Sequence, residues 1–246
     1  MDSTSLAPAA TAPKAEKKIA PRSRDFYRAM AALFCGGFAT FSLLYSAQPL
    51  LPAFAREFGL SPAESSLALS ATTATLAVAL VFAGALSDVF GRKRVMVFSL
   101  AAASATMLLA AFARNWDELV LLRAATGAAL SGLPAVAMAY LADEMATNAI
   151  GLAMGLYIAG NTVGGLSGRL VGAISGDHGS WRVGFALVGA VGLASVVLFA
   201  KSLPESRAFS PHKPDLGALW KSLIGHFADP GLRLLFATGF LVMGVS

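Results

Sequence analysis

Long apolar stretches alternate with short polar segments along most of this chain. An apolar stretch crosses a bilayer as an α-helix when it reaches roughly 20 residues. Six stretches come close to that length, and they run approximately over Ala29–Leu51, Ser66–Leu86, Val95–Ala113, Leu119–Leu141, Ile150–Ile174 and Val183–Ala200. A seventh begins near Leu232 and is cut short at Ser246. The pattern predicts an all-α membrane protein with six complete transmembrane helices and the start of a seventh.

The remaining segments divide the chain around these helices. Residues 1–25 are rich in Ala, Pro, Thr and Lys and lack the apolar core of a signal peptide, which predicts a disordered tail. Residues 26–200 make up the predicted six-helix bundle and residues 201–231 a central loop. We expect residues 232–246 to be a truncated seventh helix.

Composition and charge placement agree with a membrane protein. The chain is 56% hydrophobic and only 13% charged, whereas soluble domains carry about 25% charged residues. Six Lys or Arg residues lie in the tail, three follow the second span and five lie between Lys201 and Arg233, while the alternate loops hold only Arg56, Arg114 and Arg182. Because cytoplasmic loops are enriched in cations, we expect a multi-pass protein of the cytoplasmic (inner) membrane with a cytoplasmic amino terminus and central loop.

Several other classes of function find no support in the sequence. No basic helix carries interleaved aromatic residues, which argues against nucleic acid as a partner. The histidines His178, His212 and His226 share no ligand-like spacing, so we expect no metal site. The nucleotide-binding pattern G-x-x-x-x-G-K-[ST] is missing as well. We therefore expect a protein that is not an enzyme and holds no cofactor.

A charged loop punctuated by glycines joins the second and third spans. Its sequence follows the pattern G-x-L-x-D-x-x-G-R-K-R. Gly84 would let a neighbouring helix approach closely, Gly91 permits the positive φ of a sharp reversal, and Asp88 can pair with a cation or face a helix N-terminus. The cations that would hold this loop at the inner leaflet are Arg92, Lys93 and Arg94.

This loop resembles the signature loop between helices 2 and 3 of the major facilitator superfamily of secondary transporters. Further similarity follows in order along the chain, at Gln48–Pro52, Phe58–Ser61, Trp181–Phe185 and Leu203–Ser206. The resemblance implies a twelve-helix fold of two six-helix bundles, each made of two inverted three-helix repeats, with the solute site between them near mid-membrane. This chain would be the amino-terminal bundle, the central loop and the start of helix 7.

The loop between the fourth and fifth spans carries Asp143 and Glu144 but no Lys or Arg, against the positive trend of that face. We expect Asp88, Arg92 and either Asp143 or Glu144 to form a charge cluster that holds the inner gate in one state. Such a cluster would bias a two-state equilibrium by roughly tenfold.

Glycines recur at every fourth residue of the fifth span, and the set is Gly160, Gly164, Gly168, Gly172 and Gly176, with Gly165 beside them. This spacing puts them on one face, where missing side chains let another helix come very close. The stretch resembles the helix-5 motif of efflux antiporters in the superfamily, although it lacks the usual proline after a central glycine. Two interpretations remain open: close packing within one bundle, or a gating contact with the second bundle.

Polar side chains within the spans are candidates for lining a solute cavity. Arg123 belongs to an R-x-x-x-G pattern similar to one in the family's fourth helix, and a guanidinium inside a span must face protein or water. We expect Arg123 to face the translocation cavity, the alternative being an arginine that anchors the membrane interface. The other candidates follow helical spacing and are Phe38, Ser42, Tyr45, Gln48, Tyr157 and Asn161. They either line the cavity or form ordinary interhelical contacts. The sequence suggests no role for Arg169.

We therefore expect a transporter that moves a small solute by alternating access, by efflux in exchange for protons. The proton gradient would be its energy source, and the lipid bilayer and a carboxyl-terminal six-helix half its partners. No Asp or Glu lies in mid-span, so a proton carrier would lie at a helix mouth or in the other half. The alternatives are an importer of sugars or organic acids, and a truncated chain that only binds or assembles with other proteins.

Overall fold

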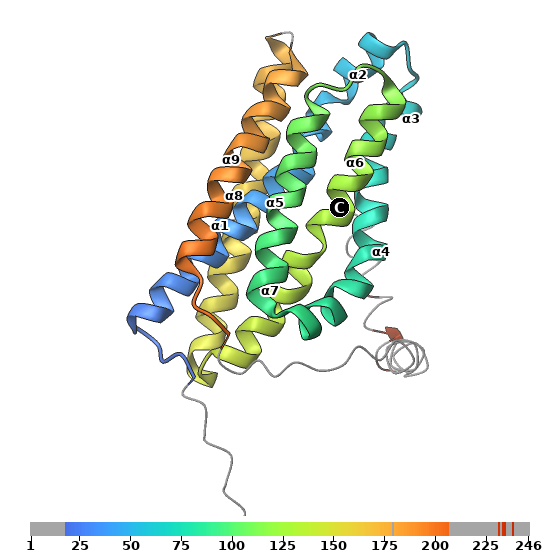
Figure 1. The fold of residues 1–246 in the computed structure, drawn as a ribbon. Coiled ribbons are helices and arrows are strands. Elements are labelled where there is room, and N and C mark those ends of the chain that lie inside the picture. The colour runs from blue at the N-terminus through green and yellow to red at the C-terminus, as the bar shows by residue number, and fades with distance from the viewer. Residues whose placement is uncertain (1–17, 179, 207–230, 232, 235–237, 239–246) are drawn as a thin grey trace, which may run out of the picture.

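The computed structural model describes residues 18–178 and 180–206, together with four positions between 231 and 238. Within these residues the chain is helical, with no strand beyond an isolated bridge between Ile19 and Met145. Six helical segments are long and apolar enough to cross a membrane, which confirms the prediction. They stand side by side in one bundle (Figure 1). The first 17 residues, most of the predicted central loop and nearly all of the predicted seventh helix lie outside the described residues.

Several of the six segments contain more than one helix. The first consists of α1 (Arg24–Tyr45), the short η1 (Gln48–Leu50) and α2 (Leu51–Phe58), and the second of α3 (Pro62–Ser65) and α4 (Leu67–Phe90). The third is α5 (Arg92–Ala110), and the fourth joins α6 (Trp116–Leu130) to α7 (Gly132–Glu144). The fifth is α8 (Thr147–Asp177) and the sixth α9 (Trp181–Ser202).

Two prolines explain the interruptions in the first and fourth segments. Proline has no N–H, so the carbonyl four residues earlier loses its helical hydrogen bond. Pro49 stands four residues after Tyr45, where α1 ends, and Pro134 stands four residues after Leu130, where α6 ends. Each break is short, so both segments continue across the bundle.

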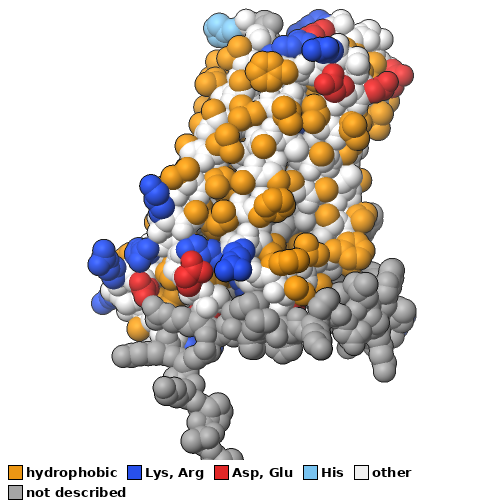
Figure 2. Space-filling model, in the orientation of Figure 1, with side chains coloured by type: hydrophobic (Ala, Val, Ile, Leu, Met, Phe, Trp, Pro, Cys, Tyr) orange, Lys and Arg blue, Asp and Glu red, His pale blue; other side chains and the backbone are white. Residues whose placement is uncertain are grey.

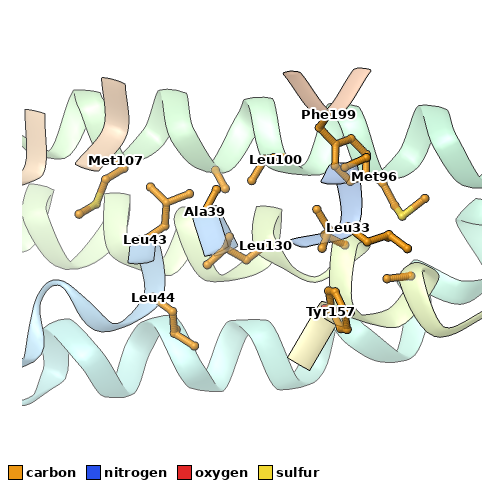
Figure 3. Packing of buried hydrophobic residues seen from close by; sticks show 14 of the residues in the cluster. Leu33, Ala39, Leu43, Leu44, Met96, Leu100, Met107, Leu130, Tyr157 and Phe199 are labelled. Carbon is orange, nitrogen blue, oxygen red and sulfur yellow. The ribbon is translucent and has the colours of Figure 1, made fainter. Parts of the chain in front are cut away.

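The first segment forms the centre of the bundle. In its most hydrophobic stretch 67% of residues are buried, against 17% in the second segment. α1 packs chiefly on α8 and also on α9, while α5 packs on α6 and α9. The buried cluster includes Leu33 and Leu43 of α1, Leu100 and Met107 of α5 and Tyr157 of α8 (Figure 3). Most side chains of α1 are therefore used in packing.

The outer surface carries a broad apolar belt between two charged ends (Figure 2). Its large side chains include Phe98, Phe112 and Leu121, each more than 65% exposed. Basic side chains gather at the lower end of the view, where α1 begins, and a second charged group caps the opposite end (Figures 1 and 2). Because a lipid-facing surface must be apolar, the belt marks the part of the bundle that lies in the bilayer.

Residues 18–23 differ from the predicted disordered tail, which was expected to extend to residue 25. Ile19 is buried, its N–H donates to the Glu144 carbonyl at 2.7 Å, and its own carbonyl accepts from the Ala146 N–H at 3.1 Å. Ser23 then caps α1 by accepting a hydrogen bond from the Phe26 N–H at 3.1 Å. One apolar residue and one capping serine thus fix the end of the tail, although the tail as a whole is polar.

Candidate functional site

Arg92 connects the start of α5 with the end of α7. Its Nε donates to Asp143 Oδ2 at 2.7 Å, and its Nη1 lies 3.3 Å from Asp88 Oδ1. The same Nη1 donates to Ser87 Oγ at 3.0 Å. Gly91, directly before Arg92, has a φ of 93°, the conformation that the sharp reversal requires. Asp88, Arg92 and Asp143 therefore come together in one cluster, which we call the inner charge cluster.

Glu144 belongs to a different set of contacts. Its side chain is buried and accepts a hydrogen bond from Ser206 Oγ. Lys93 pairs with Glu205 Oε1 at 2.8 Å, while Arg94 is exposed. Of the two acidic candidates, Asp143 is the ion-pair partner of Arg92. Glu144 instead contacts Ser206, in the segment that follows α9.

The environment of Gly84 differs from the prediction. Apart from the neighbouring residues of its own helix, no atom of the described residues lies within 4 Å of the position that a Cβ of Gly84 would occupy. The predicted close approach of another helix is therefore not met within this bundle. The reason is that α4 lies at the edge of the bundle, where most of its surface is exposed.

Glycines of α8 lie directly against the backbone of α1. A Cβ added to any of four glycines would collide with a backbone group there, and the pairs are Gly160 with Phe34, Gly164 with Phe38, Gly168 with Ser42, and Gly172 with Ser46. The pairing advances by four residues on each helix at every step, so the two parallel helices remain in backbone contact along their length. The glycine face of α8 therefore packs against α1 within this bundle, which is the first of the two interpretations.

Two predicted cavity residues of α1 take part in packing. Ser42 is only 4% exposed and its Oγ donates to the Gly164 carbonyl at 2.8 Å. Phe38 lines an apolar groove shared with α8 and α9. Ser42 thus forms an interhelical contact, which is the second of the two interpretations, because the close approach of α8 covers this side of α1. Phe38 is half-buried beside the groove, and its place in a solute cavity stays a prediction.

Arg123 is buried inside the bundle. Its side chain has no exposed surface. The guanidinium donates to the carbonyl oxygens of Leu43 at 3.0 Å, Leu44 at 2.9 Å and Ala68 at 3.3 Å, and it lies 5.6 Å from the centre of the Phe185 ring. Carbonyls in the last turn of a helix lack intrahelical donors, so the arginine joins α6 to the end of α1. The expectation that Arg123 faces the translocation cavity is thus contradicted.

Three buried polar atoms of α1 and α8 have no hydrogen-bond partner of good geometry in the described part of the chain. They are Thr40 Oγ1, Tyr157 Oη and Asn161 Oδ1. Tyr157 and Asn161 lie one turn apart on α8 and both face Gly37 of α1, where an added Cβ would collide with the Asn161 side chain. An unpaired buried polar group costs roughly 1–3 kcal/mol. The atoms of Tyr157 and Asn161 are therefore suited to a polar ligand or water. Thr40, which is not among the predicted cavity residues, lies on a different face of α1 from Phe38 and Ser42, two residues from each.

Arg169 is the accessible cation of α8. Its Nε donates to Gln48 Oε1 at 2.8 Å, and its guanidinium carbon lies 4.1 Å from the centre of the Tyr45 ring. Gly165, one turn earlier, leaves room for the Tyr45 ring, and its carbonyl accepts from Arg169 Nη1 at 3.4 Å. No ion pair of Arg169 is found among the described residues. The sequence left Arg169 without a role, yet it joins two predicted cavity residues.

We call the residues beside the α1–α8 contact together the polar seam, and its members are Tyr45, Gln48, Tyr157, Asn161 and Arg169. The polar seam follows one side of the α1–α8 contact from the buried Tyr157 and Asn161 to the accessible Arg169. Groups of three or more His, Cys, Asp or Glu side chains able to hold a metal ion are not found among the described residues. The arrangement can offer hydroxyl, amide and guanidinium groups to a solute, but it does not assemble a nucleophile with a base.

Comparison with curated proteins finds membrane transporters. The chain is 48% identical over 220 residues to the inner membrane transport protein YnfM of Escherichia coli K12, which covers 89% of this chain and 53% of that protein. It is 44% identical over 219 residues to the uncharacterized MFS-type transporter YybF of Bacillus subtilis, and the match covers 89% of this chain and 54% of that protein. The multidrug resistance protein MdtG of Proteus mirabilis is 33% identical over 181 residues, covering 70% and 44%. The chain thus spans about half the length of the curated relatives it matches.

Solved structures share the fold. The peptide transporter POT in complex with sulfate matches with a TM-score of 0.67 at 16% identity, over 87% of this chain and 46% of that one. The human organic anion transporter MFSD10 matches with a TM-score of 0.62 at 18% identity, over 77% of this chain and 50% of that one. A family model described as Major Facilitator Superfamily matches residues 30–246. The chain belongs to the major facilitator superfamily of membrane transporters.

Proposed function

We propose that this chain forms the amino-terminal half of a secondary active transporter that exports a small solute in exchange for protons. Its family consists of transporters, not enzymes. Relatives named multidrug resistance proteins favour export over uptake. Two bundles rocking about a central site would expose the solute to each side of the membrane in turn. The cations near the start of α1 favour an amino terminus in the cytoplasm.

The observation that carries this proposal is the polar seam. A bundle that served only as a membrane anchor would gain nothing from unpaired polar atoms beside its central helix, because each costs free energy in a dry interior. Nor would it gain from an accessible guanidinium held in a fixed orientation by Gln48 and the Tyr45 ring. Both features are explained if water and solute reach this side of the α1–α8 contact.

The proposed division of labour follows from the chemistry of the side chains. Asn161 and Tyr157 offer hydrogen bonds to polar groups of the solute near the middle of α8. Arg169, closer to the other end of α8, attracts an anionic or carbonyl group and guides the solute toward them. The described spans offer no mid-span carboxylate, so the coupling proton binds at a helix mouth, such as Asp117 or Glu118, or in the other half.

The inner charge cluster has a separate role in this proposal. Asp88, Arg92 and Asp143 lie at the end of the bundle where α1 begins and belong to α4, α5 and α7, whereas the polar seam belongs to α1, η1 and α8. The cluster acts as a latch on the cytoplasmic side and stabilises one of the two transport states.

The test uses the complete transporter, with this chain joined to its carboxyl-terminal half. Export is measured as resistance of cells to a panel of toxic solutes and as solute-dependent proton movement in proteoliposomes. Asn161→Ala and Arg169→Gln should each lower export at least tenfold at unchanged amounts of protein in the membrane. Val163→Ala is the matched control, because Val163 lies on an exposed face of the same helix. Equal export by all three variants would contradict a role for the polar seam, and uptake driven by the gradient would contradict the direction.

A further inference from the structure

A second feature of the bundle lies apart from the polar seam. An apolar groove of about 590 Å³ runs between α8 and α9, with α1 along its floor. The residues that shape it are Ala31, Phe34, Cys35 and Phe38 of α1, Leu156 of α8 and Leu198 of α9. Its volume falls within the roughly 300–1,000 Å³ typical of ligand sites. Leu156 and Asn161 are five positions apart, about 140° around α8, so groove and polar seam face different directions.

The floor of the groove, formed by α1, leads directly to a set of cations. Along α1, Phe38, Cys35, Ala31, Arg28 and Arg24 follow one another at intervals of three and four residues, which places them on one face of the helix. The apolar members of this stripe line the groove, and the two arginines at its end are exposed.

The wall formed by α9 also ends in a cation. On α9, Lys201 stands three residues after Leu198 and is exposed. Arg28 Nη2 donates to the Lys201 carbonyl at 2.9 Å, which brings the two helices together at the end of the groove. Asp25 lies 3.8 Å from Arg28 and offsets part of the charge, but among the described residues of α1 and α9 the three cations Arg24, Arg28 and Lys201 outnumber this carboxylate. The end of the groove is therefore positive.

The dimensions match one leaflet of a bilayer. Ten residues separate Arg28 from Phe38, which is about 15 Å along an α-helix, and half of a bilayer's hydrocarbon core is also about 15 Å. The polar groups in the groove are already engaged, since Ser195 Oγ donates to the Val191 carbonyl at 2.8 Å. The slot thus offers apolar contact over the depth of one leaflet and positive charge at the level of the headgroups.

We propose that this groove is a binding site for a phospholipid with an anionic headgroup. One acyl chain lies along α1 between α8 and α9, and the phosphate and headgroup contact Arg24, Arg28 and Lys201. An anionic lipid is favoured over a zwitterionic one because the cations exceed the nearby carboxylate. The bound lipid would hold α8 and α9 in place on α1. This proposal does not depend on which solute the transporter carries.

The site is tested by photocrosslinking of the whole chain in nanodiscs that contain phosphatidylcholine and phosphatidylglycerol in equal amounts. Either lipid carries a diazirine in its acyl chain in separate samples, and mass spectrometry locates the crosslinks. We expect the phosphatidylglycerol probe to label residues 31–38 several-fold more than the phosphatidylcholine probe. The double variant Arg28→Gln with Lys201→Gln should remove this preference, and Arg28→Lys with Lys201→Arg should retain it. Arg114→Gln is the control, because Arg114 is an exposed cation at the other end of the bundle.

Cys35 supplies an independent measurement because it is the single cysteine of the chain and lines the groove. Its alkylation by a maleimide should be several-fold slower in phosphatidylglycerol nanodiscs than in phosphatidylcholine, and this difference should vanish in the Gln double variant. Equal crosslinking by the two lipid probes, or a preference that survives the Gln double variant, would overturn the proposal. So would crosslinks spread evenly over the exposed faces of α4 and α5.

Discussion

Gly164 offers a quantitative test of the contact between α1 and α8. A Cβ at this position would lie 2.6 Å from the Cα and from the carbonyl carbon of Phe38, whereas ordinary contacts begin near 3.4 Å. Both neighbours are backbone atoms, so the clash cannot be relieved by rotation of a side chain. In Gly164→Ala the two helices must separate by about 1 Å, and dispersion contacts between α1 and α8 are lost.

The expected cost combines three terms. Overpacking of a well-packed site costs about 1–3 kcal/mol, and loss of the hydrogen bond from Ser42 Oγ to the Gly164 carbonyl adds about 0.6 kcal/mol. Replacing glycine by alanine within a helix returns about 0.5–1 kcal/mol. We therefore expect Gly164→Ala to lower the free energy of unfolding by about 1–3 kcal/mol.

The assay is unfolding of the purified chain by titration with sodium dodecyl sulfate, followed by circular dichroism. Gly155→Ala is the matched control, because Gly155 lies on the same helix and no described atom outside the neighbouring residues of α8 lies within 4 Å of its added Cβ. That variant should be as stable as the unsubstituted chain or slightly more stable. The reasoning would be refuted if the two variants unfolded at the same detergent concentration.

Three further substitutions test other parts of the structure. Arg123→Gln should lower the free energy of unfolding by about 1–3 kcal/mol in the same titration, because it removes the guanidinium that donates to the buried carbonyls of Leu43 and Leu44. Unchanged stability would show that the guanidinium is not needed there. In the complete transporter, Asp143→Asn should reduce transport several-fold without loss of membrane insertion, because it removes the negative charge that pairs with Arg92 at 2.7 Å. Glu144→Gln is the control, because it should leave the pair between Arg92 and Asp143 intact. If the two substitutions changed the salt dependence of transport equally, the latch would be contradicted.

The membrane fold could be predicted from the sequence because length and hydropathy alone determine which stretches cross a bilayer. The glycine spacing likewise predicted close helix packing, but not its partner, since a stripe of missing side chains carries no information about the helix that fills it. The structure assigns that partner to α1. Here the decisive contacts are backbone atoms of Phe34 and Phe38, which no side-chain pattern could reveal.

Charged residues were harder to place from sequence. Arg123 and Arg169 both lie within spans, and periodicity alone could not tell which one is buried. Arg123 is buried because unpaired carbonyls at the end of α1 lie within its reach, whereas Arg169 is accessible beside Tyr45. Similarly, Ile19 is one apolar residue in a polar tail, and its pairing with the α7–α8 turn depends on a contact far away in the chain. Each of these outcomes is decided by tertiary neighbours.

The most direct test of the half-transporter proposal is solute-dependent proton movement in proteoliposomes, measured with an internal pH indicator. Residues 1–246 are reconstituted alone, and in parallel together with a separately expressed carboxyl-terminal six-helix half. We expect no solute-dependent signal from the chain alone, because alternating access needs two bundles, and a clear signal when both halves are present. Proton-coupled flux through vesicles that hold only residues 1–246 would contradict the proposal and would indicate that copies of this chain supply both bundles.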